Sequence, residues 1–305
     1  MSLSSGEERG PCGRYTRSVL VFFLILFVGV NIQSAETWPD GLSFVGLAEG
    51  RWRLYIVFPG GSQPQVAATA LEPRTPTYNP RTGRVAYIDV DGSVREIVLE
   101  QVTERVLLYA DGQHTFTQPA YDAEGKRLFV VVLKDRESVE TDIVAVDGDR
   151  SHPVVTQRSA QFEPYVHATG QIYYSNVICT LGCGKIIQEL WRMHLVSGEA
   201  EQLTLLNAIA RQPVVSQDGQ WLYFSSNKGG NFHLWRLALE TGQYEQLTTG
   251  RVTDSSPALT QDGQVYFIRH APTGTYLMRR GADGAIQPLS LPDTVQDLRD
   301  LEIHR

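Results

Sequence analysis

The sequence predicts an all-β fold, a six-bladed β-propeller made of four-stranded antiparallel blades. Beyond Trp38, short alternating apolar segments are separated by glycine, aspartate and asparagine, with no convincing helical stretch. A short motif also recurs at intervals that match the length of one blade. The segment after Trp38 matches part of the clearest copy of this repeat. These observations predict a single propeller domain over residues 36–305.

The repeat is clearest in residues 213–219 (PVVSQDG) and 257–263 (PALTQDG), which have the same spacing from proline to glycine. Degenerate copies end at Gly83, Gly125 and Gly170, so successive glycines are 42, 45, 49 and 44 residues apart. This spacing suits a four-stranded blade, which buries its faces only by stacking on its neighbours. Five complete blades are predicted.

A sixth blade follows from the N-terminal part of the domain. Residues 42–57 align without a gap with residues 222–237, but the first strand of that blade is missing. Residues 295–305, after the last complete blade, are predicted to supply it and so to close the ring between the chain ends. A helix at 295–302 is the alternative.

The N-terminal segment has the pattern of an export signal. Arg14 and Arg17 precede an apolar run at 19–30, and the small residues Ser34 and Ala35 follow it. The run is nearer the length of a signal peptide than of a spanning helix. We therefore predict that residues 1–35 are a cleaved signal peptide, with a retained signal anchor as the alternative, and that the protein is extracytoplasmic, either periplasmic or secreted.

Two cysteines, Cys179 and Cys183, lie four residues apart between two strand-like runs. Export would allow them to form a disulfide, which is the prediction, and two free thiols in a hairpin loop are the alternative. A metal site there lacks the further ligands that it would need nearby.

The formal net charge is −7, and no run of Lys and Arg suits several neighbouring phosphates. This excludes a nucleic-acid partner, and the acidic balance itself indicates only solubility.

Residues 224–237 (FSSNKGGNFHLWRL), followed by Thr241-Gly242 and residues 246–248 (QLT), resemble the repeat of TolB-type propellers. The resemblance spans residues 41–305 and is sharp over about 200–265, without an obvious N-terminal TolB domain. It implies the propeller architecture and an envelope compartment, and it names no partner. TolB proteins themselves bind an envelope lipoprotein and colicins through the propeller. Similar repeats also occur in prolyl oligopeptidase-like peptidases and certain sugar lyases.

Common catalytic signatures are absent from the sequence, including Gly-x-Ser-x-Gly, His-Glu-x-x-His and a phosphate-binding glycine loop. The seven histidines have no metal-ligand spacing, and His194 and His233 are predicted to be ordinary third-strand residues. Residues 89–92 (DVDG) are interpreted as a hairpin turn and not as half a calcium loop. We therefore expect no enzyme activity, no cofactor and no metal site.

Propeller geometry places a binding site at the mouth of the central channel, next to residues just before each inner strand. Polar residues that differ from blade to blade are the candidates. They are Thr117, Gln118, Gln161, Glu163, Arg211, Gln212, Asp254, Ser255 and Ser256.

Three functions fit these features. The first is an extracytoplasmic scaffold, a monomeric propeller that binds an envelope or extracellular protein. The second is a propeller that binds or cleaves glycans, which would need acid, base or metal groups converging in the channel. The third is a sensor domain tethered by residues 18–32, the only contact with the membrane if this segment is not cleaved.

Overall fold

The structure, a computed structural model, describes residues 38–134, 140–179 and 184–304. These residues form twenty-four strands and no helix, so the predicted all-β class is confirmed. No helix in these ranges could therefore cross a membrane. The apolar run at 19–30 and Cys183 lie outside the described residues, so the export signal and the disulfide stay predictions.

The strands form six antiparallel sheets of four strands each. The first sheet contains β24 (Val295–Ile303), β1 (Leu42–Ala48), β2 (Arg51–Ile56) and β3 (Gln65–Ala67), in that order. The second contains β4 (Arg74–Asn79), β5 (Arg84–Ile88), β6 (Val94–Val98) and β7 (Thr103–Leu108). The third contains β8 (His114–Tyr121), β9 (Leu128–Lys134), β10 (Thr141–Asp147) and β11 (Arg150–Val155).

The remaining three sheets follow the same order along the chain. The fourth contains β12 (Gln161–His167), β13 (Gln171–Cys179), β14 (Ile187–His194) and β15 (Ala200–Gln202). The fifth contains β16 (Ala210–Val215), β17 (Trp221–Ser226), β18 (His233–Ala238) and β19 (Tyr244–Gln246). The sixth contains β20 (Thr253–Leu259), β21 (Val265–Ala271), β22 (Gly274–Arg280) and β23 (Ile286–Pro288).

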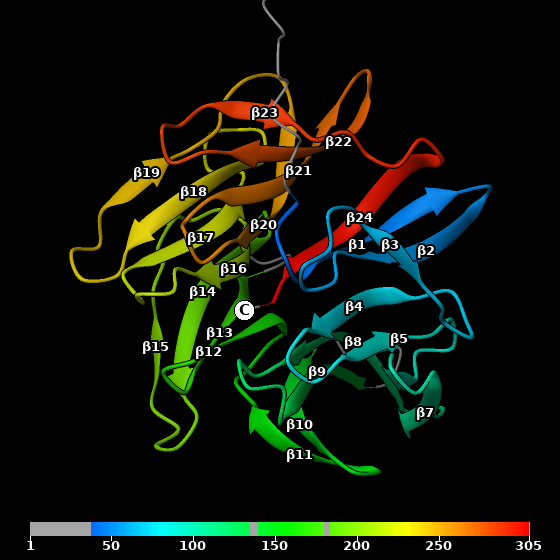
Figure 1. The fold of residues 1–305 in the computed structure, drawn as a ribbon. Helices are drawn as coiled ribbons and strands as arrows, with labels where there is room; N and C mark the ends of the chain where they lie inside the picture. Colours follow the sequence, from blue (N-terminus) through cyan, green and yellow to red (C-terminus); the bar gives the residue numbers. More distant parts are fainter. Residues whose placement is uncertain (1–37, 135–139, 180–183, 305) are drawn as a thin grey trace, which may run out of the picture. The chain divides into compact units, whose positions relative to one another are not determined.

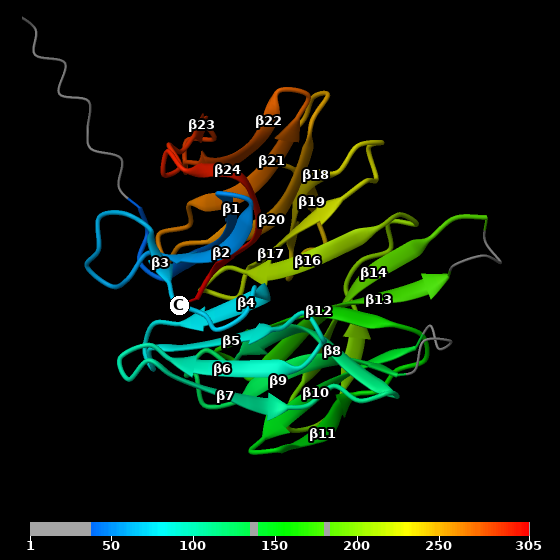
Figure 2. The same cartoon turned by 90° about the vertical axis from the view of Figure 1, so that its right-hand side faces the viewer.

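The six sheets are arranged around a common centre as the blades of a propeller (Figure 1). Strands β24, β4, β8, β12, β16 and β20 lie innermost, and the fourth strand of each blade lies at the periphery (Figures 1 and 2). Because each blade is an antiparallel meander, the hairpin between its second and third strands and the connection to the next blade emerge on one face. We call this the hairpin face.

The first blade combines segments from the two ends of the described chain. Strand β24 pairs antiparallel with β1, with Leu42 opposite Ile303 and Gly46 opposite Leu298. Residues 295–303 are therefore a strand, and the alternative helix at 295–302 is wrong. The pairing covers an edge of β1 that would otherwise be unpaired.

The apolar core is divided into six clusters, and each cluster lies between two neighbouring blades. Phe44 of the first blade, for example, packs in one cluster with Tyr266 and Leu277 of the sixth. Phe224 packs with Tyr173 of the preceding blade in another. As the repeat predicted, a blade is stabilised mainly through contact with its neighbours.

The repeat glycines occupy turns that need a left-handed backbone. Gly125 has φ +68°, and a Cβ added there would lie 2.6 Å from the side chain of Asn79 on the neighbouring blade. The turn at 89–92 is also confirmed as a hairpin, in which Asp89 Oδ1 accepts hydrogen bonds from the amides of Asp91 and Ser93, each at 3.0 Å. His194 and His233 lie on third strands, as predicted.

Candidate functional site

Every inner strand carries a bulge at the centre of the propeller, and at each bulge one residue has a left-handed backbone. We call these six residues the channel ring: Thr75, Gln118, Glu163, Gln212, Ser256 and Asp300, with φ between 43° and 59°. The strand register shifts at each of these positions. A positive φ is uncommon for residues other than glycine, so surrounding contacts must hold it in place.

Hydrogen bonds from blade to blade provide those contacts. The amide of Thr75 donates to Asp300 Oδ2 at 3.1 Å, and the amide of Gln118 donates to Thr75 Oγ1 at 3.1 Å. The amide of Glu163 donates to Gln118 Oε1 at 2.9 Å, and that of Gln212 donates to Glu163 Oε2 at 2.8 Å.

The amide of Ser256 continues the series by donating to Gln212 Oε1 at 2.8 Å. At five successive junctions, therefore, a ring side chain accepts the ring amide of the following blade. Because each bond joins two blades, the ring side chains both line the channel and connect the blades to one another.

The ring surrounds a cavity of about 170 Å³ on the axis of the propeller. The residue after each ring position also lines this cavity, and it is proline in five blades and Leu301 in the first. Glu302 lines the same cavity as well as a second one, of about 110 Å³, at the end of the inner strands, which His167 and His304 also line. The two cavities have Pro164, Tyr165 and Glu302 in common, and we refer to them together as the central channel.

Three carboxyl groups line the channel, and burial raises the pKa of each. Burial raises the pKa of Glu163 despite the opposing hydrogen bonds from the Gln212 amide and the Ser175 hydroxyl and the charge of Arg211. It likewise raises the pKa of Asp300, against the hydrogen bond from the Thr75 amide. Removal from water disfavours the ionised form of a carboxyl group.

Glu302 is affected most, because burial raises its pKa to about 8. Its Oε1 accepts a hydrogen bond from Thr77 Oγ1 at 2.9 Å, whereas its buried Oε2 has no hydrogen-bond partner among the described residues. The channel therefore holds a carboxyl group that is mainly protonated at neutral pH and can either donate or accept a proton.

Of the nine predicted mouth residues, four belong to the channel ring: Gln118, Glu163, Gln212 and Ser256. Thr117, Arg211 and Ser255 each directly precede a ring residue. All nine lie within the inner strands, so the expectation that they precede those strands is wrong.

Asp254 and Gln161, each two residues before a ring position, are fully buried. Asp254 accepts two hydrogen bonds from Arg269, Nε to Oδ1 at 2.7 Å and Nη2 to Oδ2 at 2.9 Å. The side-chain Nε2 of Gln161 donates to the carbonyl oxygens of Gln157 and Ser159, each at 2.9 Å. These contacts hold both side chains inside the protein, away from a ligand at the mouth.

Sequence reasoning missed Thr75, Asp300 and Glu302. Thr75 precedes a proline, as the ring residues Gln118 and Glu163 do, and this pattern could have revealed it. Asp300 and Glu302 lie on β24, which lacks the proline of the repeat, so no such signal marked them.

Within residues 38–134, 140–179 and 184–304, no three His, Cys, Asp or Glu side chains are placed to hold a metal ion. Two tryptophan rings are each covered by an arginine side chain. The Arg299 guanidinium lies 4.2 Å from the ring centre of Trp52, and that of Arg236 lies 4.1 Å from that of Trp221.

Six four-stranded blades around a polar axial channel define a six-bladed β-propeller of the repeat type indicated by the sequence. A family model described as "TolB beta propeller domain" matches residues 44–294. The chain belongs to this TolB β-propeller family.

Solved structures of the same fold are distant in sequence. TolB from Acinetobacter baumannii is 16% identical with a TM-score of 0.68, and the match covers 86% of this chain but only 66% of that one. A putative TolB from Agrobacterium tumefaciens is 14% identical with a TM-score of 0.63, covering 82% and 87%. Oligogalacturonate lyase from Vibrio parahaemolyticus is 12% identical with a TM-score of 0.58, covering 83% and 77%. The search of curated proteins gave no match.

Proposed function

We propose that the chain is a non-enzymatic protein-binding scaffold of the cell envelope, and that its partner binds at the hairpin-face mouth of the central channel. The observation that carries the proposal is the channel ring, whose six positions are equivalent in backbone geometry and carry five different kinds of side chain. Six equivalent positions with Thr, Gln, Glu, Gln, Ser and Asp side chains present an asymmetric polar surface, which suits one specific partner.

Membership of the TolB β-propeller family supports a protein partner. In this proposal residues 1–35 direct export, as a cleaved signal peptide or as a retained anchor, and residues 36–305 form the propeller. The pairing of β24 with β1 then closes the ring of blades. A closed ring keeps the channel residues in fixed positions, and this lowers the entropic cost of binding.

The proposal can be tested with a variant that replaces the channel carboxyl groups by amides and leaves the hydrogen-bond acceptors of the ring in place. Glu163→Gln, Asp300→Asn and Glu302→Gln together meet this condition, because each amide oxygen can still accept the hydrogen bond that the carboxyl oxygen accepts. Envelope extract would be passed over the immobilised full-length chain, and retained proteins would be identified by mass spectrometry.

The matched control replaces three exposed acids on the opposite face, Glu100→Gln, Asp149→Asn and Glu240→Gln. We expect a partner that the wild type and the control retain equally and the channel variant loses. A partner retained by all three would place binding elsewhere. Retention of no specific protein would refute the scaffold.

A second candidate, a glycan-cleaving propeller, is favoured by one observation. Glu163, Asp300 and Glu302 line one channel, and burial raises the pKa of all three, as general acid catalysis requires. A screen of uronate-containing and neutral oligosaccharides against wild type and the channel variant tests it. Product formation by the wild type alone would replace the scaffold proposal with this one.

A further inference from the structure

Two patches of exposed apolar side chains lie on the hairpin face, away from the channel ring. The first, which we call the acidic patch, consists of Val90, Asp91, Tyr109 and Asp111. The second, which we call the basic patch, consists of Lys185, Ile186, Leu205, Lys228 and Tyr244. Exposed apolar patches with a charged border are typical of protein interfaces.

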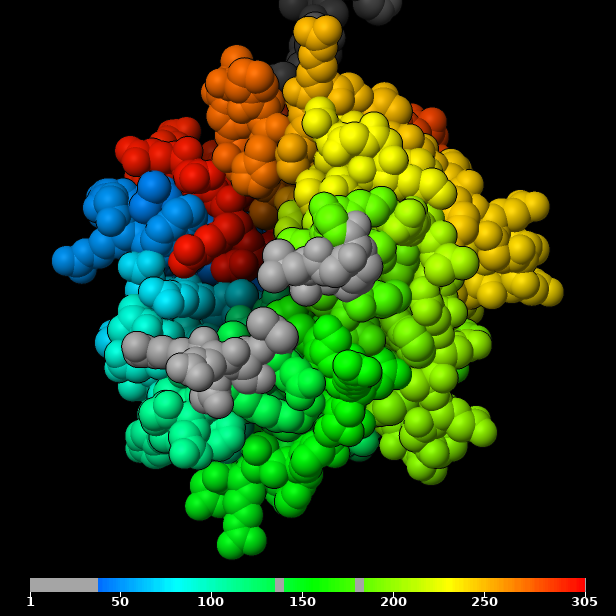
Figure 3. Space-filling view, turned by 180° about the vertical axis from the view of Figure 1, so that it is seen from behind, coloured from blue at the N-terminus to red at the C-terminus, as the bar shows by residue number. Residues whose placement is uncertain are grey.

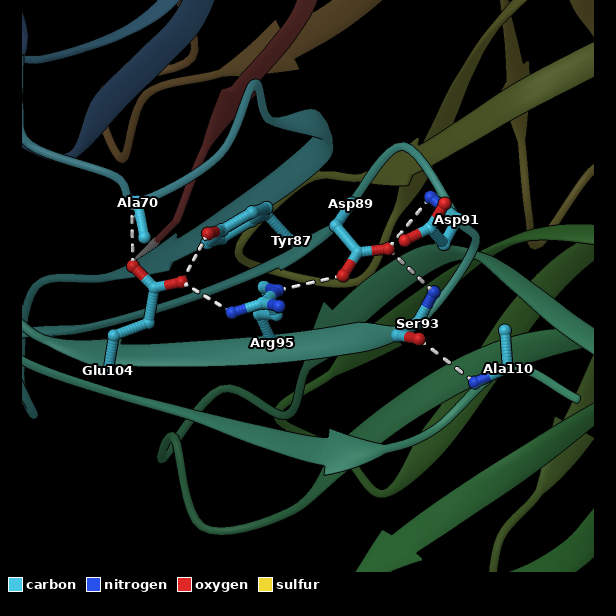
Figure 4. Close-up of polar contacts among 8 residues, drawn as sticks. All are labelled: Ala70, Tyr87, Asp89, Asp91, Ser93, Arg95, Glu104 and Ala110. Atoms are coloured by element: carbon cyan, nitrogen blue, oxygen red, sulfur yellow. Dashed lines mark hydrogen bonds and ion pairs between the residues drawn. The ribbon is translucent and has the colours of Figure 1, made fainter.

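The acidic patch is held in shape by buried polar contacts (Figure 4). Asp89 fixes the hairpin that carries Val90 and Asp91, through its bonds to the Asp91 and Ser93 amides. The Ser93 hydroxyl accepts a hydrogen bond from the Ala110 amide at 2.9 Å, which ties this hairpin to the loop carrying Tyr109. Tyr109 is 77% exposed and Val90 is 49% exposed.

Two carboxylates border this patch. Hydrogen bonds from the amides of Gln113 and His114 lower the pKa of Asp111, which therefore stays ionised at neutral pH. The His114 Nδ1 atom lies 3.4 Å from Asp111 Oδ1, and the Arg95 guanidinium is already bonded to Asp89 and Glu104.

The basic patch is displayed in a similar way. Buried Glu189 accepts hydrogen bonds through Oε1 from the amides of Leu206 and Asn207, at 2.7 and 2.8 Å, and so fixes the loop that exposes Leu205. Leu205 is 83% exposed. The Lys185 ammonium donates to the Asn207 carbonyl oxygen at 2.8 Å, which places the hairpin bearing Ile186 beside this loop.

Lys228 completes this patch. Its ammonium lies 5.4 Å from the ring centre of Tyr244. Within the part of the chain that the structure describes, neither Lys185 nor Lys228 forms an ion pair. The patch thus carries uncompensated positive charge on a chain whose net charge is −7.

The two patches are complementary, since each pairs apolar side chains with charges opposite to those of the other. Apart from Tyr244, which lies on β19 and is reached by the Lys228 ammonium, their residues belong to hairpins and connections of the hairpin face. Figure 3 shows the two groups of segments, coloured cyan to green and yellow-green to yellow, on different sides of that face. A two-fold axis in the plane of the face exchanges two such patches, so that each meets the other patch of a second copy.

We propose that the chain forms a symmetric face-to-face dimer, in which the acidic patch of each copy packs on the basic patch of the other. This departs from the monomer predicted from the sequence. It does not rest on the proposed function, although a partner that needs the same face would compete with the second copy.

The test is a charge exchange measured by sedimentation equilibrium of the full-length chain in density-matched neutral detergent. One variant carries Lys185→Glu and Lys228→Glu, and the other carries Asp91→Lys and Asp111→Asn. Asparagine at position 111 keeps a side-chain oxygen that can accept the hydrogen bond from the His114 amide. We expect the wild type to be a dimer. Each variant alone should have a dimer dissociation constant at least about tenfold higher, and the equimolar mixture of the two variants should again form a dimer.

Restoration is expected because both contacts in the mixed dimer are complementary, one with native charges and one with exchanged charges. Leu205→Ser is an independent variant, which should weaken the wild-type dimer without changing charge. A monomeric wild type at the highest soluble concentration overturns the proposal. So does a dimer that both charge variants retain, since it would use another surface.

Discussion

The channel carboxyl of Glu302 makes the stability of the protein depend on pH in a direction opposite to that of a salt-bridged acid. Because burial raises its pKa from 4.5 to about 8, the folded chain keeps this proton at pH values where the unfolded chain has lost it. Stability therefore falls as pH rises from the unfolded pKa toward the folded one.

The magnitude follows from the two pKa values. At about 1.36 kcal/mol for each pH unit, the full loss between pH 4.5 and 8 is at most about 5 kcal/mol. Glu302 lines two open cavities, and water in them reduces the penalty for ionisation. We expect about 2 to 3 kcal/mol after this screening.

The perturbation is Glu302→Gln, which resembles the protonated acid and cannot ionise. Urea unfolding of wild type and variant at pH 5, 7 and 9 gives the difference in unfolding free energy, from which the other titrating groups cancel. The unfolding free energy of the variant should rise relative to that of the wild type as the pH increases, and it should be about 2 to 3 kcal/mol higher at pH 9. Parallel pH profiles for the two proteins would refute the assignment of a raised pKa to this residue.

Three further predictions concern contacts that hold the blades. Arg269→Ala leaves Asp254 buried without its cation and should cost about 3 to 5 kcal/mol in urea unfolding, whereas a change below 1 kcal/mol would contradict the ion pair. Gln118→Ala removes the acceptor of the Glu163 amide and should cost about 1 to 3 kcal/mol, while Gln118→Glu keeps the acceptor and should cost less. Gly125→Ala should lower the melting temperature, because its φ of +68° strains alanine and its Cβ meets the neighbouring blade, and an unchanged melting temperature would argue against both.

The fold could be predicted from the sequence because each repeat contains short, local patterns that mark its turns and strands. Turn glycines such as Gly125 and Gly219 recur at blade spacing, and alternating apolar residues mark each strand between them. The C-terminal strand could be predicted by counting, since the blade beginning at β1 lacked its first strand. These features depend on short segments, which is why a single sequence was sufficient.

The candidate site was harder to predict because it depends on the bulges. A residue before proline normally adopts an extended backbone, yet Gln118 and Glu163 precede prolines and have φ of 50° and 59°. This conformation is held by bonds to other blades, which no local pattern reveals. The bulge decides which side chains line the channel, and this explains why Asp254 was expected at the mouth and lies buried.

The contact between β1 and β24 also bears on how the protein folds. The two strands come from opposite ends of the described chain, so their pairing can form only after all the intervening blades have been synthesised, with a high entropic cost of closure. Until then the edge of β1 is open to other strands. We expect folding to end with this step, and a chain shortened before Val295 to aggregate during refolding.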